Sequence, residues 1–508
     1  MSTGTRDPPA TVAEDGGTRA DPATATRRRI SRRRLLEAAV ASSVLGAGAY
    51  GLSQLGGAAA PRPFRSRPDL DPPPVSVVVP AAETGRGLVF LTASRTSQHQ
   101  HGPMIVDDGG RLVWFRPVTN GSTNLRVQQL RGRPVVTWWE GEIVMPGYGR
   151  GDYVIADTSY RELTRVHAGN GLSGDLHEFV VTPAGTALFT AYRTITADLS
   201  PIGGAPRATV LDSLVQEVDI ASGEVRFQWS AAAHVPLSDS YLPAPSATAD
   251  PYDFFHVNSI DVLPNGDLLI SSRHTWALYR ISRPGGRVVW RVGGKQSTFE
   301  VDARGRFAFQ HDARAHPGSV ITLFDDGAGE TQVETRSRGL KLALDTMTMT
   351  ARFLEEYLPD PTFVASSQGS VQVLPDGNVF VGWGSQPYVS EYRKDATLVF
   401  DAMLSDNASS YRAFRFPWTG RPTSPPALAA ERAGAATIRA YASWNGATGV
   451  ERWDVLAGPS ASQLEVVGRA RRTGFETDMT AHSPGDHVAV QALDASGRVL
   501  GRSSVTRI

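Results

Sequence analysis

The chain has 508 residues, with 51 basic and 51 acidic side chains and a formal net charge of zero, and 41% of its residues are hydrophobic. This length exceeds that of one ordinary domain, and the balanced charge excludes a nucleic-acid binder that relies on neutralising phosphates. The 50 glycines and 34 prolines favour a turn-rich, all-β protein, while the lack of cysteine excludes disulfides and thiolate chemistry.

An export signal is predicted at the start of the chain. Residues 1–26 are rich in Thr, Ala, Asp, Gly and Pro, a composition typical of disorder. Residues 27–60 resemble a twin-arginine signal, because Ser31-Arg32-Arg33 comes just before Leu35-Leu36 and Ala58-Ala59-Ala60 provides a small-residue cleavage site. Residues 61–74 are interpreted as a linker. The signal predicts an extracellular or cell-surface protein; an uncleaved signal would instead tether the protein to a membrane.

A repeated strand pattern dominates residues 75–416. A polar residue opens an alternating strand and a turn proline follows six positions later, as in His177 before Pro183, Asn258 before Pro264 and His311 before Pro317. A fourth copy has Gly369 before Pro375. Counting inner strands in this part of the chain gives six units of roughly fifty residues, which predicts a six-bladed β-propeller as the catalytic domain, although a count of seven stays open.

The composition changes again at residues 417–426, which are rich in proline. Residues 427–508 then alternate as short strands, and Trp444 and Trp453 are most simply explained as core residues. We therefore expect a small C-terminal β-sandwich of the fibronectin type III kind, and we expect no chemistry in it.

The repeat predicts where the chemistry lies. Innermost strands line the central channel of a propeller, so His177, Asn258 and His311 should meet at one depth. His256 precedes Asn258 by two residues and should project from the same strand face, and Arg273 ends the partner strand. Imidazoles can act as nucleophile or base near pH 7, and a guanidinium forms a planar fork suited to tetrahedral oxyanions.

The remaining histidines and Glu391 are less clearly linked to this group. A structural role is the simpler interpretation for the remaining histidines, of which His274 and His316 are out of phase with the repeat; the others are His99, His101, His167, His234, His482 and His487. Glu391 is either a base at the channel mouth that contacts substrate or a structural hydrogen-bonding carboxylate. The histidine spacing does not match helical metal motifs, so no metal or cofactor is expected, although three imidazoles remain able to hold zinc.

The order and spacing of these motifs resemble those of the bacterial arylsulfate sulfotransferases, and most closely the arylsulfotransferase branch of actinobacteria and fungi. The matching motifs, which cover roughly residues 75–405, are Pro103-Met104-Ile105-Val106, Leu112-Val113-Trp114, Asp175-Leu176-His177-Glu178, Phe255-His256-Val257-Asn258-Ser259-Ile260, Ser271-Ser272-Arg273, Phe309-Gln310-His311-Asp312, Gly377-Asn378-Val379 and Gly382-Trp383-Gly384.

This resemblance implies a PAPS-independent transfer of a sulfuryl group from a phenolic sulfate ester to an acceptor phenol through a sulfohistidine. Carried over motif by motif, it makes His311 the nucleophile and His177 and His256 acid/base and sulfuryl-binding groups. Arg273, with Asn258, would then hold the sulfonate oxygens.

Two other hypotheses remain. The same scaffold supports a hydrolase that passes the group to water, or a metal-dependent lyase, and it also supports a non-catalytic propeller used for binding. The oligomeric state does not follow from the sequence.

Overall fold

The computed structural model describes residues 64–96, 98–144, 147–246 and 251–508, which belong to one compact unit, Arg62–Ile508. The disordered stretch predicted for residues 1–26 and the signal predicted for residues 27–60 lie outside the described residues, as does the start of the linker. Within the described part of the chain, no helix is long and apolar enough to span a membrane.

The described residues are all-β, as predicted, and contain no α-helix. The three short 3-10 helices are η1 (Ser200–Ile202), η2 (Leu237–Asp239) and η3 (Ala303–Gly305). The turns of the repeat form as the sequence predicts: in Pro264-Asn265-Gly266 the Gly266 N–H donates to the Leu263 carbonyl, and Gly266 has a φ of 87° that favours glycine.

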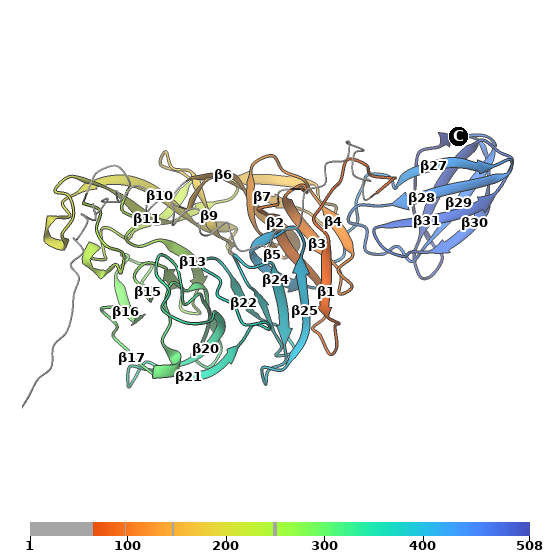
Figure 1. Cartoon of the computed structure of the whole chain (residues 1–508). Coiled ribbons are helices and arrows are strands. Elements are labelled where there is room, and N and C mark those ends of the chain that lie inside the picture. The colour runs from red at the N-terminus through yellow and green to blue at the C-terminus, as the bar shows by residue number, and fades with distance from the viewer. Residues whose placement is uncertain (1–63, 97, 145–146, 247–250) are drawn as a thin grey trace, which may run out of the picture. The chain divides into compact units, whose positions relative to one another are not determined.

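Five antiparallel sheets are built from the strands between residues 75 and 416 (Figure 1). One sheet has the order β26 (Ser409–Phe416), β2 (Leu88–Ser94), β3 (Gly102–Val106) and β4 (Leu112–Phe115). An eight-stranded sheet contains β5 (Gly121–Leu130), β6 (Arg133–Val144), β7 (Tyr148–Ala156), β8 (Glu162–Val166), β9 (Gly174–Val181), β10 (Thr186–Ala197), β11 (Ala208–Asp219) and β12 (Val225–Ser230).

The other three sheets follow in chain order. One contains β13 (Val257–Val262), β14 (Leu268–Ser272), β15 (Ala277–Ile281) and β16 (Val288–Gly293). The next contains β18 (His311–His316), β19 (Val320–Asp325), β20 (Arg338–Asp345) and β21 (Thr350–Tyr357), with the short β17 (Glu300–Val301) added in parallel to β21. The last contains β22 (Ser370–Val373), β23 (Val379–Gly382), β24 (Tyr388–Tyr392), β25 (Leu398–Leu404) and β1 (Val75–Val79).

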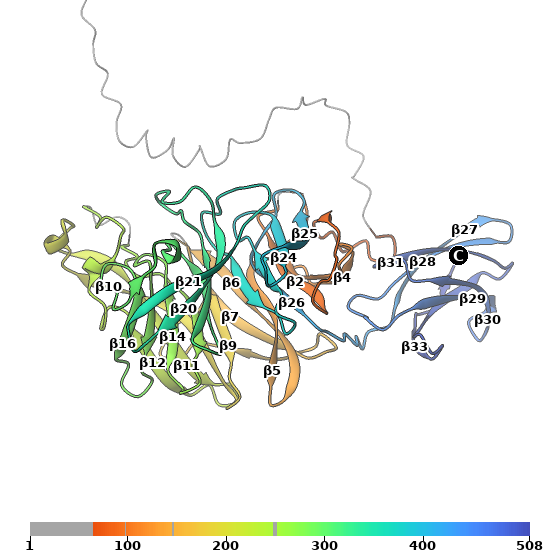
Figure 2. The same ribbon diagram turned by 90° about the horizontal axis from the view of Figure 1, so that it is seen from below.

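The ring is closed by strands from both ends of this region. The late strand β26 pairs with the early strand β2, and the early strand β1 pairs with the late strand β25. In Figures 1 and 2 the sheet with β24 and β25 accordingly lies beside the sheet with β2. This arrangement is a β-propeller, as predicted. The count of six blades stays a prediction, because the eight-stranded sheet joins two expected blades through the single pair Gly151 and Gly174.

Residues 427–508 form two further sheets. One contains β27 (Ala427–Gly434), β28 (Thr437–Ser443) and β31 (Glu476–His482); the other contains β30 (Gln463–Arg471), β29 (Arg452–Ser460), β32 (His487–Leu493), β33 (Val499–Arg502) and β34 (Thr506–Arg507). Trp453 is buried in the core between them, whereas Trp444 is only partly buried against it.

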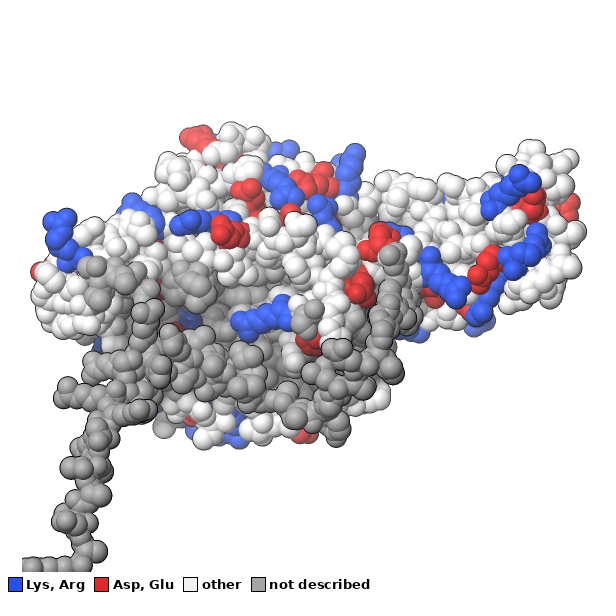
Figure 3. Space-filling model, turned by 45° about the horizontal axis from the view of Figure 1, so that its top comes forward, with Lys and Arg blue, Asp and Glu red and all other residues white. Residues whose placement is uncertain are grey.

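Acidic and basic side chains are mixed on the molecular face drawn in Figure 3, with small clusters of each sign rather than one large patch. Such a surface provides little long-range steering for a highly charged polymer.

Candidate active site

A cavity of about 830 Å³ is lined by His177, His256, His311 and Arg273. The four residues come from three different sheets: His177 lies on β9, His311 begins β18, and His256 and Arg273 flank β13 and β14. All four are at least nine-tenths buried. The structure thus brings together the three imidazoles and the guanidinium that the repeat register and the motifs pick out.

Each of the three histidines is held by its own aspartate. The distance from Nδ1 to the carboxylate oxygen is 2.6 Å for His177 and Asp175, and 2.5 Å for His256 and Asp253. The corresponding distance is 2.7 Å for His311 and Asp326. Because the aspartate engages Nδ1, the Nε2 atom of each ring is left for chemistry in the cavity.

The rings lie close enough to act on one small group. The ring centroids of His177 and His256 are 4.7 Å apart, and the Tyr411 ring lies 5.6 Å from His177 and 6.2 Å from His311. The backbone N–H of Gln368 donates to His311 Nε2 at 3.3 Å, so this nitrogen carries a lone pair rather than a proton.

Burial keeps two of the imidazoles neutral. It lowers the pKa of His256 to about 4, although the Asp253 carboxylate acts in the opposite direction. Burial also lowers the pKa of His311 well below its usual value, and the positive charge of Arg273 adds to this effect. Neutral imidazoles are the form that can attack an electrophile or accept a proton.

The three aspartates are not equivalent. Burial alone would raise the pKa of Asp175 and of Asp253, but the adjacent imidazoles outweigh it and lower both values. For Asp326, burial prevails and raises the pKa well above its usual value. Asp326 is therefore the one suited to share the Nδ1 proton of its histidine.

Arg273 faces the cavity with its guanidinium stacked over Phe309, at 4.9 Å from the ring centroid. It donates from Nη1 to His274 Nε2 at 2.6 Å and from Nη2 to the Ser366 carbonyl at 3.2 Å. Its Nη1 also lies 2.9 Å from the Glu330 carboxylate. The charge is thus fixed in position, as binding of a sulfonate requires.

Asn258 and Glu391 do not line this cavity. The Asn258 amide donates to the Gln310 carbonyl at 2.7 Å, because the backbone bulges between Val257 and Ser259 and His256 adopts a φ of 55°. The expectation that His256 and Asn258 share a face through simple alternation is therefore wrong: His256 enters the cavity and Asn258 lies outside its lining.

Glu391 is a buried residue of β24. Its carboxylate accepts from the Gly85 N–H at 2.6 Å and from Asn378 Nδ2 at 2.8 Å, and it forms an ion pair with Arg415 at 2.7 Å. These contacts correct the prediction of a substrate-binding role and favour the structural alternative, because the carboxylate is fully buried and held by the protein itself.

Several cavity residues escaped the sequence analysis. His274 and His101, which were set aside, both line the cavity, and the three aspartates were not singled out. Tyr411 also lines it, with a buried hydroxyl that has no hydrogen-bond partner among the described residues. The signal for Tyr411 was present: it stands six residues before Pro417, the spacing of the repeat.

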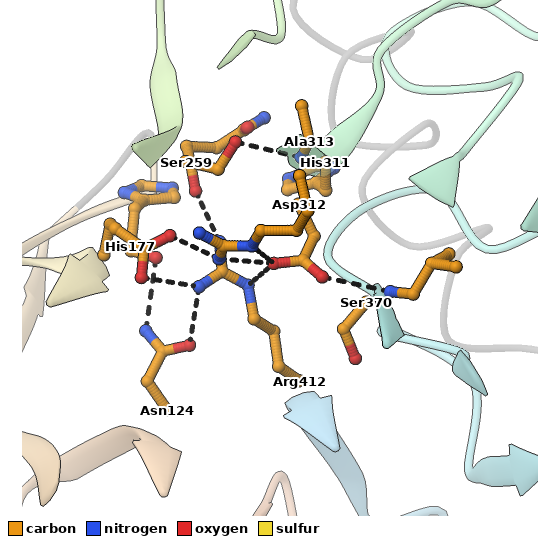
Figure 4. Close-up of polar contacts among 12 residues, drawn as sticks. Asn124, His177, Ser259, His311, Asp312, Ala313, Ser370 and Arg412 are labelled. Carbon is orange, nitrogen blue, oxygen red and sulfur yellow. Dashed lines mark hydrogen bonds and ion pairs between the residues drawn. The ribbon is translucent and has the colours of Figure 1, made fainter. Parts of the chain in front are cut away.

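A charged layer lies next to the histidines in the channel (Figure 4). Glu178 forms ion pairs with Arg126, Arg314 and Arg412 at 3.2, 2.5 and 3.2 Å. Asp312 pairs with Arg314 and Arg412 at 2.6 and 3.2 Å. Burial opposes ionisation of Glu178, but the three arginines together lower its pKa to about 2. Three guanidinium groups thus lie beside the two carboxylates of this layer, next to the cavity histidines.

In the part of the chain that the structure describes, one set of side chains has ligand atoms close enough for a metal ion: Asp253, His256 and His274, within 4.8 Å of one another. Its atoms are already used, since Nδ1 of His274 donates to the Asp253 carbonyl and Nε2 accepts from Arg273. The adjacent guanidinium repels a cation, so the donor set does not favour a metal.

Comparison with known proteins identifies one family. Residues 126–405 match the family model described as "Arylsulfotransferase (ASST)". A comparison with curated proteins finds no match.

Solved structures resemble the chain only distantly. A Bacteroides caccae protein of unknown function is 12% identical with a TM-score of 0.38, and covers 65% of this chain and 98% of its own. Regucalcin, a calcium-binding protein from Agrobacterium tumefaciens, is 14% identical with a TM-score of 0.29, over 60% of this chain and 77% of its own. Virginiamycin B lyase from Staphylococcus aureus is 9% identical with a TM-score of 0.24, and covers 65% of this chain and 83% of its own. At these scores the structures carry no argument about function.

Proposed function

The chain belongs to the arylsulfotransferase (ASST) family, and from this premise we propose that it transfers a sulfuryl group from a phenolic sulfate ester to an acceptor phenol through a sulfohistidine at His311. One observation carries the proposal: three histidines, each fixed by an aspartate, turn Nε2 toward the same cavity as a buried arginine. The small-molecule donor and acceptor need no cofactor in this scheme. Export by the twin-arginine route remains part of the proposal.

In the first half-reaction, His311 Nε2 forms a bond to sulfur while the bond from sulfur to the phenolic oxygen breaks. The phenolate leaves with both electrons of that bond and takes a proton from the His177 imidazolium, because the one N–H of the neutral His256 is directed at Asp253. Arg273 and the Gln368 N–H stabilise the equatorial oxygens of the sulfuryl group. As the His311 ring becomes cationic, the raised pKa of Asp326 suits its carboxylate to share the Nδ1 proton.

In the second half-reaction, an acceptor phenol occupies the place of the product. Its hydroxyl proton passes to the His177 imidazole, which regains the proton given up in the first half-reaction, and its oxygen attacks sulfur as the bond to His311 breaks. One cavity serves donor and acceptor in turn, which predicts ping-pong kinetics.

The test uses 4-nitrophenyl sulfate with purified protein, with and without phenol and with a chelator. We expect phenol-dependent release of nitrophenol that the chelator leaves unchanged. Release without phenol would indicate a hydrolase, and loss of activity with the chelator would indicate a metal enzyme. No turnover with any phenolic donor and acceptor pair would favour a binding module.

The nucleophile is tested with His311→Ala, which should reduce transfer to the uncatalysed rate. The matched control is His316→Ala on the same strand, because His316 lies outside this cavity and bonds Thr322. Mass spectrometry after exposure to donor should find one added sulfuryl group on the peptide that contains His311. A modified histidine elsewhere, or full activity of His311→Ala, would contradict the assignment.

A further inference from the structure

Arg273 is already paired with an anion of the protein. Glu330 lies with its two carboxylate oxygens 2.9 and 3.2 Å from Arg273 Nη1, and it lines the same cavity. No other carboxylate among the described residues forms an ion pair with Arg273. The cationic group that would bind a sulfonate therefore carries a negatively charged partner at its cavity side.

The chain around Glu330 is built to reach Arg273. Ala328 and Gln332 form an isolated antiparallel bridge, so Glu330 stands at the tip of a tight loop between β19 and β20. Gly329 has no room for a side chain, because a Cβ there would lie 2.6 Å from Arg273 Nη2 and from the Phe309 ring. This glycine allows the loop backbone to pass directly against the arginine.

The two partners differ in exposure. The Arg273 side chain is 8% exposed, whereas the Glu330 side chain is 49% exposed. Such a carboxylate can leave Arg273 for water without being stranded in an apolar environment. In the free protein, partial burial opposes ionisation of Glu330, but contacts with His274 and Arg273 lower its pKa, so it competes in its ionised form. An anion in the cavity that is to bind Arg273 Nη1 has to take the place of the Glu330 carboxylate.

We propose that Glu330 is a specificity-determining residue that competes with the donor's sulfonate for Arg273. This inference rests on the proposed function. A ligand with a simple carboxylate gains nothing by displacing Glu330, because it exchanges one carboxylate on Arg273 for another. A sulfonate has a third oxygen, which reaches further donors such as the Gln368 N–H beside His311 while Arg273 holds the others. Glu330 thereby restricts the site to tetrahedral anions.

The test measures binding of inorganic sulfate by calorimetry, at constant ionic strength because salt screens an exposed charge. Glu330→Gln should bind sulfate roughly fivefold more tightly than the wild-type protein, the effect of removing a half-exposed competitor. The KM for 4-nitrophenyl sulfate should fall by a similar factor. The matched control is Glu334→Gln, which removes the same charge from an exposed position of the same loop without contacting Arg273.

A double variant, Arg273→Gln with Glu330→Gln, should lose the gain in sulfate affinity, since the competition acts through the arginine. Unchanged or weaker sulfate binding in a folded Glu330→Gln protein would overturn the inference and make Glu330 a positioning partner of Arg273. Because sulfate binding needs no turnover, this result stands apart from a failure of the transferase assay, which would count against the proposed function alone.

Discussion

Three aspartates orient the three cavity histidines, but their surroundings shift the pKa values of these aspartates in different directions. Asp175 also accepts from the Gly149 N–H and from the Thr190 hydroxyl, which stabilises its ionised form. One carboxylate oxygen of Asp326 is buried without a partner among the described residues, and its pKa is raised. In the proposed reaction, the raised pKa of Asp326 makes its pair with His311 the one best suited to share a proton.

This difference predicts that Asp326→Asn lowers the rate of sulfuryl transfer by about 100-fold or more, because the amide cannot stabilise the cationic ring. The measurement is single-turnover formation of sulfohistidine. The neighbouring Asp325→Asn serves as the control, since Asp325 pairs with Arg338 rather than with a cavity histidine. Equal rates of the two variants, per folded molecule, would contradict a role of Asp326 in the transfer.

The low pKa of His256 links folding to pH. In the folded state this pKa is about 4, against an ordinary value near 6.5. As the pH falls from 6.5 to 4, the unfolded chain gains a proton that the folded chain does not, so the folded state loses stability across this window and no more below it. The full loss corresponds to roughly 3 kcal/mol.

Urea unfolding of the wild-type protein and His256→Asn at pH 7 and pH 4 isolates this contribution. The difference in the free energy of unfolding between the two proteins should shrink at the lower pH, because asparagine does not titrate. A difference that is constant with pH would mean that His256 keeps its ordinary pKa in the folded state.

At the level of the strands, the side chains that directly follow the repeat positions form a second regular set of contacts. Each of these side chains accepts a hydrogen bond from a backbone N–H of the next inner strand. The pairs are Glu178 with Ile260, Ser259 with Ala313, Asp312 with Val371, and Ser370 with Ala413. The same short motif thus supplies cavity residues at one position and joins neighbouring inner strands at the next.

Ser259→Ala should lower the free energy of unfolding by about 1–3 kcal/mol, because the Ala313 N–H would be left buried without its acceptor. Ser370→Ala should act in the same direction through Ala413. Chemical denaturation provides the measurement, with the exposed Ser462→Ala as a control expected to change little. Stability equal to the control would imply that the strands are held by apolar packing alone.

The repeat copy without a polar residue has its own packing reason. Gly369 has a φ of 115°, and a Cβ at this position would lie 2.4 Å from the Phe324 ring. The Phe324 ring therefore leaves no room for a side chain at this repeat position.

At the scale of the whole molecule, one side chain connects distant parts of the ring. Arg412 lies on β26, near the end of the propeller region, and pairs with Glu178 of β9 and Asp312 of β18. It also donates to the Asn258 carbonyl at 2.7 Å. The strand that closes the ring thus also supplies a cation to the two channel carboxylates.

Arg412→Ala should destabilise the protein by about 3–5 kcal/mol, because two buried carboxylates would lose a partner. Arg412→Lys should recover part of this loss, since it restores the charge without the planar fork. Thermal and urea unfolding measure both variants. If Arg412→Ala were as stable as the wild-type protein, Arg126 and Arg314 would suffice for the channel carboxylates.

Local patterning determined the all-β class, the hairpin turns, the propeller and the repeat position, because alternation and turn chemistry are properties of neighbouring residues. It was also sufficient to select His177, His256, His311 and Arg273. Only the tertiary structure decided which partners they have: Asp326 lies fifteen residues after His311, and Glu330 reaches Arg273 from another sheet. It also showed that Asn258 and Glu391 do not line the cavity. A bulge changes the direction of the Asn258 side chain, and the buried Arg415 binds Glu391; neither effect can be predicted from strand alternation. Spacing along a strand selects residue types, but the side chains that meet across a channel depend on the packing of the sheets.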